Sequence, residues 1–438
     1  MARCAVQRLL PVAHAQCGRP LVTVVLGTMF VLISGISHSA DAAEVAEIAA
    51  PKKIAAIVTV YYHNSHADMI VGRLLETQTL DGLGKSYPLQ LAGLYTDQVP
   101  PNDTSRAKSA KYGFPIYPTI AETLKLGTDK LAVDGVLLIA EHGDYPVSDT
   151  GQTVFPKRRM FEEVVQVFAE SGAVTPVFVD KHLADNWTDA KWMYDTAQRM
   201  HIPLMAGSCL PLAHRRPQAD VATDAKLREI LAVSYHTLDA YGFHAVEAVQ
   251  ALAERRSGGE TGVKSVQTLV DAAVWEAGKR GLYDPELLAA TLRHMQRPVP
   301  TDRPLEEQVP NPVLFHVEYQ DGLRTNLLTL NNAVADWAAA WRYEDGAVDS
   351  TLFWLQEDRP LVHFTHQLDG ISSMMLTGKP AWPVERTLMT SGLLDALLIS
   401  KKSAGQQLAT PQLDFDYRCD WNWRQPPDPP PGRPLTGQ

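Results

Sequence analysis

The chain has 438 residues, more than one ordinary hydrophobic core uses, so we expect two domains. It carries 40 Lys and Arg residues against 50 Asp and Glu residues, which gives a formal net charge of −10. An acidic chain without a basic cluster excludes nucleic acid as an expected partner.

The first residues have the layout of an export signal. An apolar run from Leu21 to Ile36 leads to Ala40-Asp41-Ala42, a cleavage site of the A-x-A type. Three arginines precede the run: Arg3, Arg8 and Arg19. The run is short for a membrane span. The sequence therefore predicts a signal peptide over 1–42, no stable membrane insertion after cleavage, and a periplasmic or extracellular protein, with an uncleaved anchor as the alternative.

The stretch from Ile54 to Glu76 predicts a buried strand, a tight turn and a helix. Residues 54–60 are almost wholly apolar and rich in β-branched side chains, as in a parallel strand covered on both faces. The apolar residues of the helix recur on one face: Ile70, Leu74 and Leu75. Ser65 is the expected N-cap, and Asp68 three residues later completes a capping-box pattern.

A strand that leads into a helix N-terminus is where α/β folds bind phosphate, because free N–H groups and the helix dipole converge there. This turn lacks the G-x-G-x-x-G sequence of dinucleotide-binding folds. It contains Thr59, Tyr61 and Asn64 instead, with His63 and His66 nearby. A bulky Tyr61 at the place of the second glycine is expected to keep the backbone away from a pyrophosphate.

Strands and helices alternate through residues 50–210. Four more strands are predicted after the first: Leu89–Thr96, Gly135–Ala140, Pro176–Val179 and Pro203–Gly207. Helices are predicted at Arg106–Tyr112, at Thr119–Leu126, from Phe161 to Phe168, and after an N-cap at Thr188. The alternation predicts an α/β domain over 50–210 that is built on a doubly wound parallel sheet.

Residues 211–400 are less regular and predict an α+β domain with a sheet packed against helices. Its expected strands are Leu227–Tyr235, Val313–Tyr319, Leu323–Leu330 and Phe353–Leu355. Its expected helices are Phe243–Arg255, His363–Leu376 and Glu385–Ser400. Asp321-Gly322 signals a hairpin between two of the strands. The tail over 405–438 is rich in proline and is expected to be extended or disordered.

Titratable residues follow four of the predicted parallel strands. In chain order they are His63 and His66, then Asp97, then Glu141, His142 and Asp144, then Asp180, Lys181 and His182. The carboxyl ends of parallel strands line one crevice, so the sequence predicts an active site along this edge. An acid at Asp97 is where a dinucleotide fold binds the ribose hydroxyls, with an ordinary turn aspartate as the alternative.

Two residues are candidates for proton chemistry. Lys181 follows an apolar strand, so burial is expected to lower its pKa and let it donate a proton to a hydroxyl or carbonyl oxygen, or polarise that oxygen. His244 opens the helix of the second domain and could act as a general base. A solvated lysine and a capping or interfacial histidine are the alternatives.

The order of elements over about residues 50–400 resembles the glucose–fructose oxidoreductase / inositol dehydrogenase / MocA family. Asp180-Lys181-His182 stands where this family has a Glu-Lys-Pro motif. His244 fits the family's histidine on the helix after the first strand of the second domain. The segment from Trp382 to Thr387 resembles the family's closing sugar-oxidoreductase segment.

Three features depart from the family pattern. The glycine fingerprint is missing from the first turn, and His182 replaces the proline of the Glu-Lys-Pro motif. The family's acid four residues before the histidine would be Ala240, and Asp239 is one place away.

The resemblance implies a Rossmann-like N-terminal domain, a C-terminal α/β domain with a mostly antiparallel open sheet, and NAD(P)-dependent hydride transfer on a sugar, polyol or derivative. It implies NAD or NADP as cofactor, no metal, and a homo-oligomer formed through the open sheet. The implied catalytic residues are Lys181, which polarises the reacting oxygen, His244, which takes or gives the proton, Asp180 and His182. The implied cofactor-binding residues are Thr59, Tyr61, Asn64, Ser65, His66, Glu141, His142 and Asp97, which holds the adenosine ribose.

Two other functions stay open. A cofactor-free or metal-assisted carbohydrate lyase or hydrolase could use the strand-end histidines and carboxylates, since both suit zinc or manganese, although no H-E-x-x-H motif is present. A non-catalytic saccharide-binding protein could stack sugar faces on tryptophans of the second domain, which are more often core residues. These are Trp337, Trp341, Trp354 and Trp382.

Overall fold

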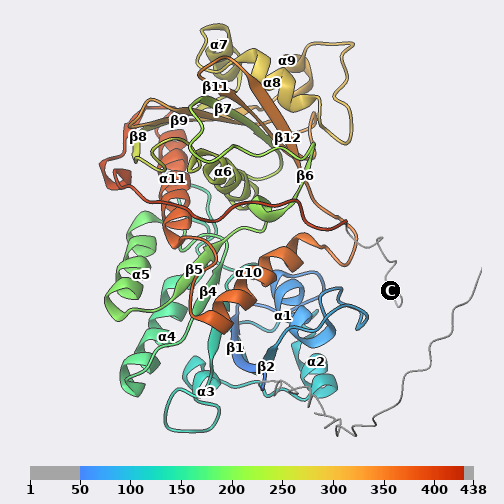
Figure 1. Ribbon diagram of the computed structural model, residues 1–438, viewed down its shortest axis with the longest axis vertical. Coiled ribbons are helices and arrows are strands. Elements are labelled where there is room, and N and C mark those ends of the chain that lie inside the picture. Colours follow the sequence, from blue (N-terminus) through green and yellow to red (C-terminus); the bar gives the residue numbers. More distant parts are fainter. Residues whose placement is uncertain (1–49, 429–438) are drawn as a thin grey trace, which may run out of the picture. The chain divides into compact units, whose positions relative to one another are not determined.

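The computed structural model describes residues 50–428, in which two β-sheets lie one above the other (Figure 1). The predicted signal peptide and the last ten residues of the predicted tail lie outside these residues. Both sheets belong to one compact unit, so a domain division between residues 210 and 211 remains a prediction. No helix within 50–428 is long and apolar enough to cross a membrane.

The first sheet has five parallel strands in the order β2-β1-β3-β4-β5. They are β1 (Lys52–Val58), β2 (Leu89–Thr96), β3 (Gly135–Ile139), β4 (Val177–Asp180) and β5 (Leu204–Gly207). Val58 pairs with Thr96 on one side and with Ile139 on the other, so these three strands end at the same level. The strand order reverses at β1, which makes the crevice beyond β1 and β3 the expected ligand position.

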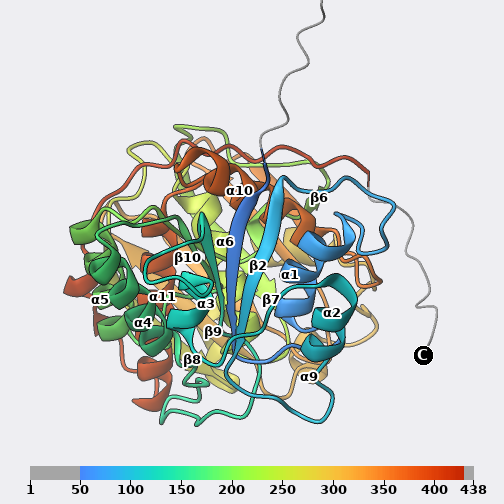
Figure 2. The ribbon, with the colours of Figure 1, turned by 90° about the horizontal axis from the view of Figure 1, so that it is seen from below.

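Helices cover both faces of this sheet, which confirms the doubly wound prediction. The helices are α1 (His66–Glu76), α2 (Ser105–Tyr112), α3 (Ile120–Lys125), α4 (Lys157–Ser171) and α5 (Trp187–Met200). Alternate strand residues face opposite ways: Ile54 and Val58 pack towards α1, and Ala55 and Ile57 pack towards α3, α4 and α5. Figure 2 shows α1 on one side of the strands and α4 and α5 on the other.

Thr188 was the wrong choice of N-cap for α5. The helix begins at Trp187, and the side chain of Asn186 accepts the capping hydrogen bond from the Asp189 N–H. Both Asn186 and Thr188 are residue types that cap helices well, and the preference for asparagine over threonine favours the observed start.

The second sheet has the order β13-β8-β9-β10-β7-β11-β12-β6, and its pairings are antiparallel except that of β10 with β7. The strands are β6 (His214–Arg216), β7 (Leu227–Ser234), β8 (Val263–Val270), β9 (Val313–Tyr319), β10 (Arg324–Thr329), β11 (Trp337–Tyr343), β12 (Val348–Trp354) and β13 (Leu408–Ala409). The hairpin of β9 and β10 is confirmed. The sequence analysis missed β8 and β11, which are central members of the sheet.

Helices lie on both sides of the second sheet as well (Figure 1). They are α6 (Ala240–Ala253), α7 (Ala272–Lys279), α8 (Pro285–Leu292), α9 (Leu305–Gln308) and α11 (Val384–Lys402), with two 3₁₀ turns at Leu210–Leu212 and Pro411–Leu413. By contrast, α10 (His363–Thr377) packs with α1 against the first sheet. Ile230 and Trp341 pack on α6 and α11, whereas Leu231 and Ala340 pack on α7 and α8. The half of the sheet under α7 and α8 is therefore not open to a second subunit.

The described part of the tail lies against the rest of the protein. The Trp421 ring lies 5.2 Å from the Arg386 guanidinium, and the Trp423 ring lies 4.4 Å from that of Arg215. The carbonyl of Pro427 lies 2.8 Å from His214 Nε2. These contacts hold this stretch of the tail in an extended conformation against the rest of the protein.

A buried ion pair joins α6 to α11 and gives a test of stability. Arg386 donates to both carboxylate oxygens of Glu254, and both side chains are almost fully buried. We predict that Glu254→Gln, which leaves the guanidinium buried and unpaired, lowers the free energy of unfolding by about 3–5 kcal/mol in a urea titration. As a control, Asp195→Asn breaks the half-exposed pair with Lys191 and should change the free energy of unfolding by less than about 1 kcal/mol. Equal effects would contradict the assignment.

Candidate active site

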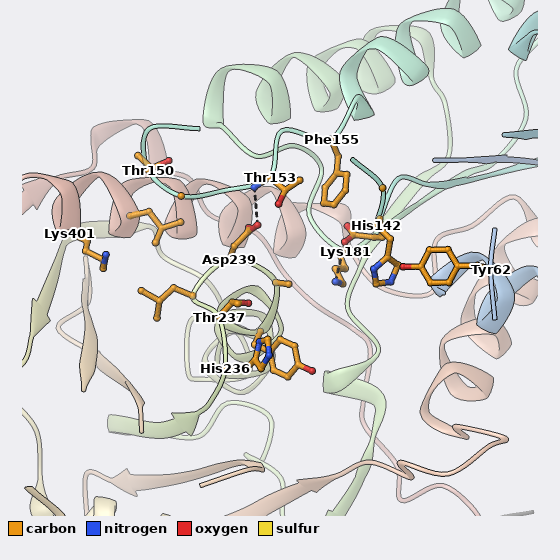
Figure 3. A pocket seen from close by; sticks show the side chains of 17 residues that line it. Tyr62, His142, Thr150, Thr153, Phe155, Lys181, His236, Thr237, Asp239 and Lys401 are labelled. Carbon is orange, nitrogen blue, oxygen red and sulfur yellow. Dashed lines mark hydrogen bonds and ion pairs between the residues drawn. The ribbon is translucent and has the colours of Figure 1, made fainter. Parts of the chain in front are cut away.

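Two adjoining cavities lie where the carboxyl edge of the first sheet faces the second sheet. The inner cavity, about 260 Å³, has a lining that includes Asn64, His66, Lys181, His244 and Trp337. The outer cavity, about 770 Å³, has a lining that includes Tyr62, Thr150, Thr153, Phe155, Asp239 and Lys401 (Figure 3). His142, Lys181 and Tyr241 line both cavities. The structure thus brings predicted residues from three strand ends together with the predicted histidine of α6.

Lys181 is held at the edge by a shared carboxylate. Its Nζ lies 3.0 Å from Glu141 Oε2, and both side chains are buried. Burial alone would lower the pKa of Lys181, but the charges of Glu141 and Asp180 outweigh it and raise the pKa above the ordinary lysine value. The predicted lowering of this pKa was therefore wrong. The reason is the buried acid, which the sequence does not place beside the lysine.

Lys157 is a buried residue of this candidate site that the sequence analysis missed. Its Nζ donates to Glu141 Oε1 at 2.8 Å and to the carbonyls of Asp180 and His182 at 2.8 and 2.9 Å. It also lies 2.8 Å from His182 Nδ1. In the sequence this lysine opens the basic run Lys157-Arg158-Arg159, a pattern typical of a solvated helix start. Nothing in the sequence distinguishes Lys157 as the buried residue of these three.

His182 lies beneath the cavities and lines neither of them. Burial and the Lys157 cation lower its pKa to about 3, so the ring is neutral and accepts the lysine hydrogen bond. Its other neighbour is the Phe243 ring, at 5.3 Å between centroids. The residue that stands in for the proline of the Glu-Lys-Pro motif therefore supports Lys157.

His66 and Asp180, from the first turn of α1 and the end of β4, are in contact. His66 Nδ1 lies 2.6 Å from Asp180 Oδ2. The His66 ring also meets the rings of Phe364 and His142, with centroids at 5.0 and 5.3 Å. The sequence analysis placed both residues at the same sheet edge but assigned them to different tasks.

His244 and His142 are two further imidazoles of the inner cavity, which His363 also lines. His244 Nδ1 lies 2.5 Å from Ser208 Oγ, and its ring faces Trp337 at 6.0 Å. Burial, helped by the charge of Lys181, lowers the pKa of His244 well below the ordinary value. Burial lowers the pKa of His142 to about 4, and its Nε2 has no hydrogen-bond partner. Both rings are neutral at pH 7.

The turn after β1 uses two of its predicted ligand-binding side chains for structure. The Thr59 hydroxyl donates to the Glu141 carbonyl at 2.7 Å and so ties the ends of β1 and β3 together. The Tyr61 ring is fully buried in the core beside α1, with its hydroxyl unpartnered. Neither side chain lines the inner cavity, whereas Asn64 and His66 do.

Ser65 caps α1 as predicted, but the capping box is only half formed. Ser65 Oγ accepts from the Asp68 N–H, while the Asp68 carboxylate accepts from Asn64 rather than from the backbone of Ser65. Arg359, which sequence analysis did not single out, donates to both Asn64 and Asp68 at 3.0 Å. A guanidinium therefore stands at the helix N-terminus where glycines are absent.

Asp97 stands at the end of β2 with its oxygens engaged. Tyr95 and Tyr145 donate to it at 2.8 and 2.7 Å, and Arg159 pairs with it at 2.5 Å. Although burial opposes it, these bonds lower the pKa of Asp97, so the group is a carboxylate. The backbone of Asp144 exchanges two hydrogen bonds with the Gln98 side chain and fixes the loop over this strand end.

Asp239 lies on the outer cavity at the start of α6. Its Oδ2 accepts from the Thr153 N–H at 3.0 Å, the dashed line of Figure 3, and its Oδ1 has no partner. Burial, with the charge of Glu141, raises its pKa, although the Thr153 hydrogen bond opposes this. Asp239 thus stands at the start of the helix that carries His244, but its side chain lines the outer cavity whereas His244 lines the inner one.

The remaining candidates are a metal site, four tryptophans and two cysteines. Within residues 50–428 no group of three or more His, Cys, Asp or Glu side chains is arranged to hold a metal ion. Of the four tryptophans, Trp341 and Trp382 are core residues, and Trp337 is buried but lines the inner cavity. Cys209 and Cys419 are both free thiols.

No protein-family model matches the chain, and no curated protein sequence matches it.

Solved structures do match its fold. GenD2 from gentamicin A biosynthesis, in complex with NAD, has a TM-score of 0.53 at 11% identity, over 83% of this chain and 97% of its own. A probable dehydrogenase from Thermotoga maritima has a TM-score of 0.51 at 13% identity, over 82% and 99%. Myo-inositol dehydrogenase from Lactobacillus casei, in complex with NAD(H) and myo-inositol, has a TM-score of 0.51 at 11% identity, over 82% and 96%. These likenesses confirm the predicted fold, a Rossmann-like sheet followed by a mostly antiparallel one.

The buried neutral His182 makes stability depend on pH. Its pKa of about 3 in the folded protein lies below the unfolded value of 6.5, so between these values the unfolded chain binds a proton that the folded one does not. Stability therefore falls as pH falls through this window. We predict that His182→Asn, which keeps an acceptor for Lys157 but cannot titrate, removes about 3 kcal/mol of the loss between pH 7 and pH 4. Urea titrations at both pH values measure this, and an unchanged pH slope would contradict the assignment.

Proposed function

We propose that this protein is an oxidoreductase that transfers hydride between NAD or NADP and a hydroxyl-bearing carbon of a sugar, polyol or derivative. The observation that carries the proposal is the meeting of Lys181, from the edge of the first sheet, with His244, from α6, in the inner cavity. The solved structures of the same fold include dehydrogenases with bound NAD, one of them with myo-inositol, which supports this reaction class.

The pyrophosphate end of such a cofactor fits the turn after β1. The Ser65 cap serves the Asp68 N–H and leaves the first N–H groups of α1 without an acceptor in the helix. Helix N-termini bind phosphate through such groups, and the Arg359 guanidinium adds a cation beside Asn64. Side-chain charge would thus replace the close backbone approach that glycines allow.

The adenosine end fits less well, because both oxygens of the Asp97 carboxylate already accept hydrogen bonds that a ribose would have to compete with. Tyr95, Tyr145 and Arg159 already bond to this carboxylate. A ribose would have to displace Tyr145 or bind to Arg159, whose side chain is 47% exposed. Because an arginine at this position accommodates a 2′-phosphate, the arrangement leaves both NAD and NADP open.

Lys181 acts as a cation in the proposed reaction. Since Glu141 keeps its pKa high, Nζ retains its proton and can donate a hydrogen bond to the reacting hydroxyl oxygen, where it stabilises developing negative charge. A nicotinamide, when bound, would supply the hydride acceptor for the carbinol carbon. The hydroxyl proton goes to an imidazole of the inner cavity, and the carbon–oxygen bond becomes a carbonyl. The resemblance assigns that proton to His244.

The setting of this reaction also stays a proposal. Export of the chain rests on the leader over residues 1–42, and a homo-oligomer rests on the resemblance alone. Any subunit contact would have to avoid the half of the second sheet that α7 and α8 cover. The rest of that sheet face is polar and partly exposed. It carries Glu318 of β9 and Arg324 of β10.

Cofactor release tests the proposal directly. We predict that residues 43–438, purified without added cofactor and then denatured, release NAD or NADP, or that the purified protein binds one of them in a calorimetric titration. Absorbance and mass spectrometry identify the nucleotide. A protein that releases none and binds none at millimolar concentration would not be this oxidoreductase, and lyase and hydrolase assays would come first.

The role of Lys181 separates catalysis from binding. We predict that Lys181→Met lowers kcat by a factor of about 10²–10⁴, because the cation that polarises the reacting oxygen is lost, while the nucleotide Kd changes little. Lys191→Met, which removes an exposed cation on α5, is the matched control and should leave both quantities unchanged. Lost nucleotide binding in Lys181→Met would argue against a catalytic role. Turnover is measured with myo-inositol and with common hexoses as probes.

A further inference from the structure

A carboxylate and an imidazole form a hydrogen-bonded pair on the inner cavity. His66 is the first residue of α1, and Asp180 is the last residue of β4. His66 Nδ1 lies 2.6 Å from Asp180 Oδ2, and the Asp180 side chain is only 1% exposed. A carboxylate in this position keeps the proton on Nδ1 and stabilises the imidazolium that forms when Nε2 takes a second proton.

The other edge of the ring is available to a ligand. Nε2 lies across the ring from Nδ1, makes no hydrogen bond to any described residue, and belongs to a side chain that lines the inner cavity. Asp180 Oδ1 is buried and has no hydrogen-bond partner either. The carboxylate therefore has His66 as its side-chain hydrogen-bond partner among the described residues.

The groups that face the pair do not compete for its proton. His142, from the loop after β3, and His244, from α6, have ring centroids 5.3 and 6.4 Å from that of His66. Burial lowers the pKa of both, and of His363 on α10, so these rings remain neutral. The Lys181 cation and the Glu141 carboxylate are engaged with each other.

Among the imidazoles that line the inner cavity, His244 is a less suitable proton acceptor than His66. Its Nδ1 lies against the Ser208 hydroxyl, which also accepts from the Leu210 N–H. A neutral hydroxyl stabilises an imidazolium less than a carboxylate does, because charge-assisted hydrogen bonds are about twice as strong as neutral ones. Lys181 adds an unfavourable like charge if His244 becomes protonated.

We propose that His66 and Asp180 are the proton-transfer pair of this site, with His66 Nε2 as the atom that accepts the proton from the ligand hydroxyl. In the oxidation direction the O–H bond breaks, its electron pair stays on oxygen to form the carbonyl, and the proton moves to Nε2. A bound nicotinamide would supply the acceptor for the hydride of the same carbon, and Asp180 neutralises the imidazolium. The inference rests on the proposed function for its substrate but not for the pair itself.

Three variants test the pair: His66→Gln, Asp180→Asn and His63→Gln. His63 is the matched control, since it lies on the same turn, 4.0 Å from the carboxylate of Asp68, but is 42% exposed and lines neither cavity. The first readout needs no ligand. In protein labelled with ¹⁵N-histidine, long-range ¹H–¹⁵N spectra should show a protonated Nδ1 on His66 in the wild type and in His63→Gln. That signal should vanish in His66→Gln and shift or exchange rapidly in Asp180→Asn.

The second readout is turnover with NAD or NADP and myo-inositol or hexose probes. We expect kcat to fall by about 10²–10⁴ in His66→Gln and in Asp180→Asn, with the nucleotide Kd within about threefold of the wild type, and the pH profile of kcat to change shape in Asp180→Asn. Wild-type kcat in either variant overturns the proposal, and so does a fall explained by lost nucleotide binding.

The oxidoreductase proposal and the His66–Asp180 proposal fail through different results. If the wild type binds no nicotinamide cofactor but keeps the Nδ1 signal, the oxidoreductase proposal fails and the pair is then tested by the same variants in the lyase and hydrolase assays. If the wild type shows no protonated Nδ1 on His66, the pair fails whether or not a cofactor binds.

Discussion

The burial of Glu141 between two lysines is the interaction on which the candidate site depends. Lys157 and Lys181 each donate to one oxygen of this carboxylate, and all three side chains are nearly excluded from water. A buried charge that loses its partners costs several kcal/mol, so Glu141 depends on the two lysines, although either lysine alone still leaves it paired. The carboxyl ends of β3 and β4 and the start of α4 are consequently held together by charge as well as by packing.

This arrangement sets the positions of the groups around it. Two lysines and one glutamate leave a net positive charge, and the charges of Asp180 and Asp239 act on Lys181 as well. Lys181 takes a positive φ of 58° while its N–H bonds to the Gly207 carbonyl, an unfavourable backbone conformation for a lysine. Lys157 also holds the carbonyls of Asp180 and His182. The segment that carries Asp180 is therefore fixed before any ligand enters, which is the preorganisation that electrostatic catalysis requires.

Much of the fold follows from patterns that a sequence displays openly. The five parallel strands are short runs of apolar residues between turns, and their carboxyl ends had to meet at one edge, so His66, Glu141, Asp180 and Lys181 could be placed together. Strand β11 was missed because its sequence, WAAAWRY, is rich in alanine and lacks the alternation of apolar and polar residues that indicates a strand. Lys157 and Arg359 were missed because their roles depend on partners distant in the chain. The direction predicted for the pKa of Lys181 was wrong because the sequence places Glu141 at the same edge but does not show that its carboxylate lies within hydrogen-bond distance of Nζ.

The turn after β1 illustrates how side chains can replace a backbone motif. A glycine turn offers N–H groups to a phosphate, whereas here Tyr61 fills the core under α1 and His66 occupies the first helical position. A helix N-terminus disfavours a cationic imidazole by about 0.3–1 kcal/mol, because the helix dipole is positive there. A hydrogen bond to a charged group contributes about 1.5–3 kcal/mol, so Asp180, 2.6 Å away, more than offsets the dipole. The contact between His66 and Asp180 therefore joins the first turn of α1 to the end of β4, at the position where a glycine turn would present only backbone N–H groups.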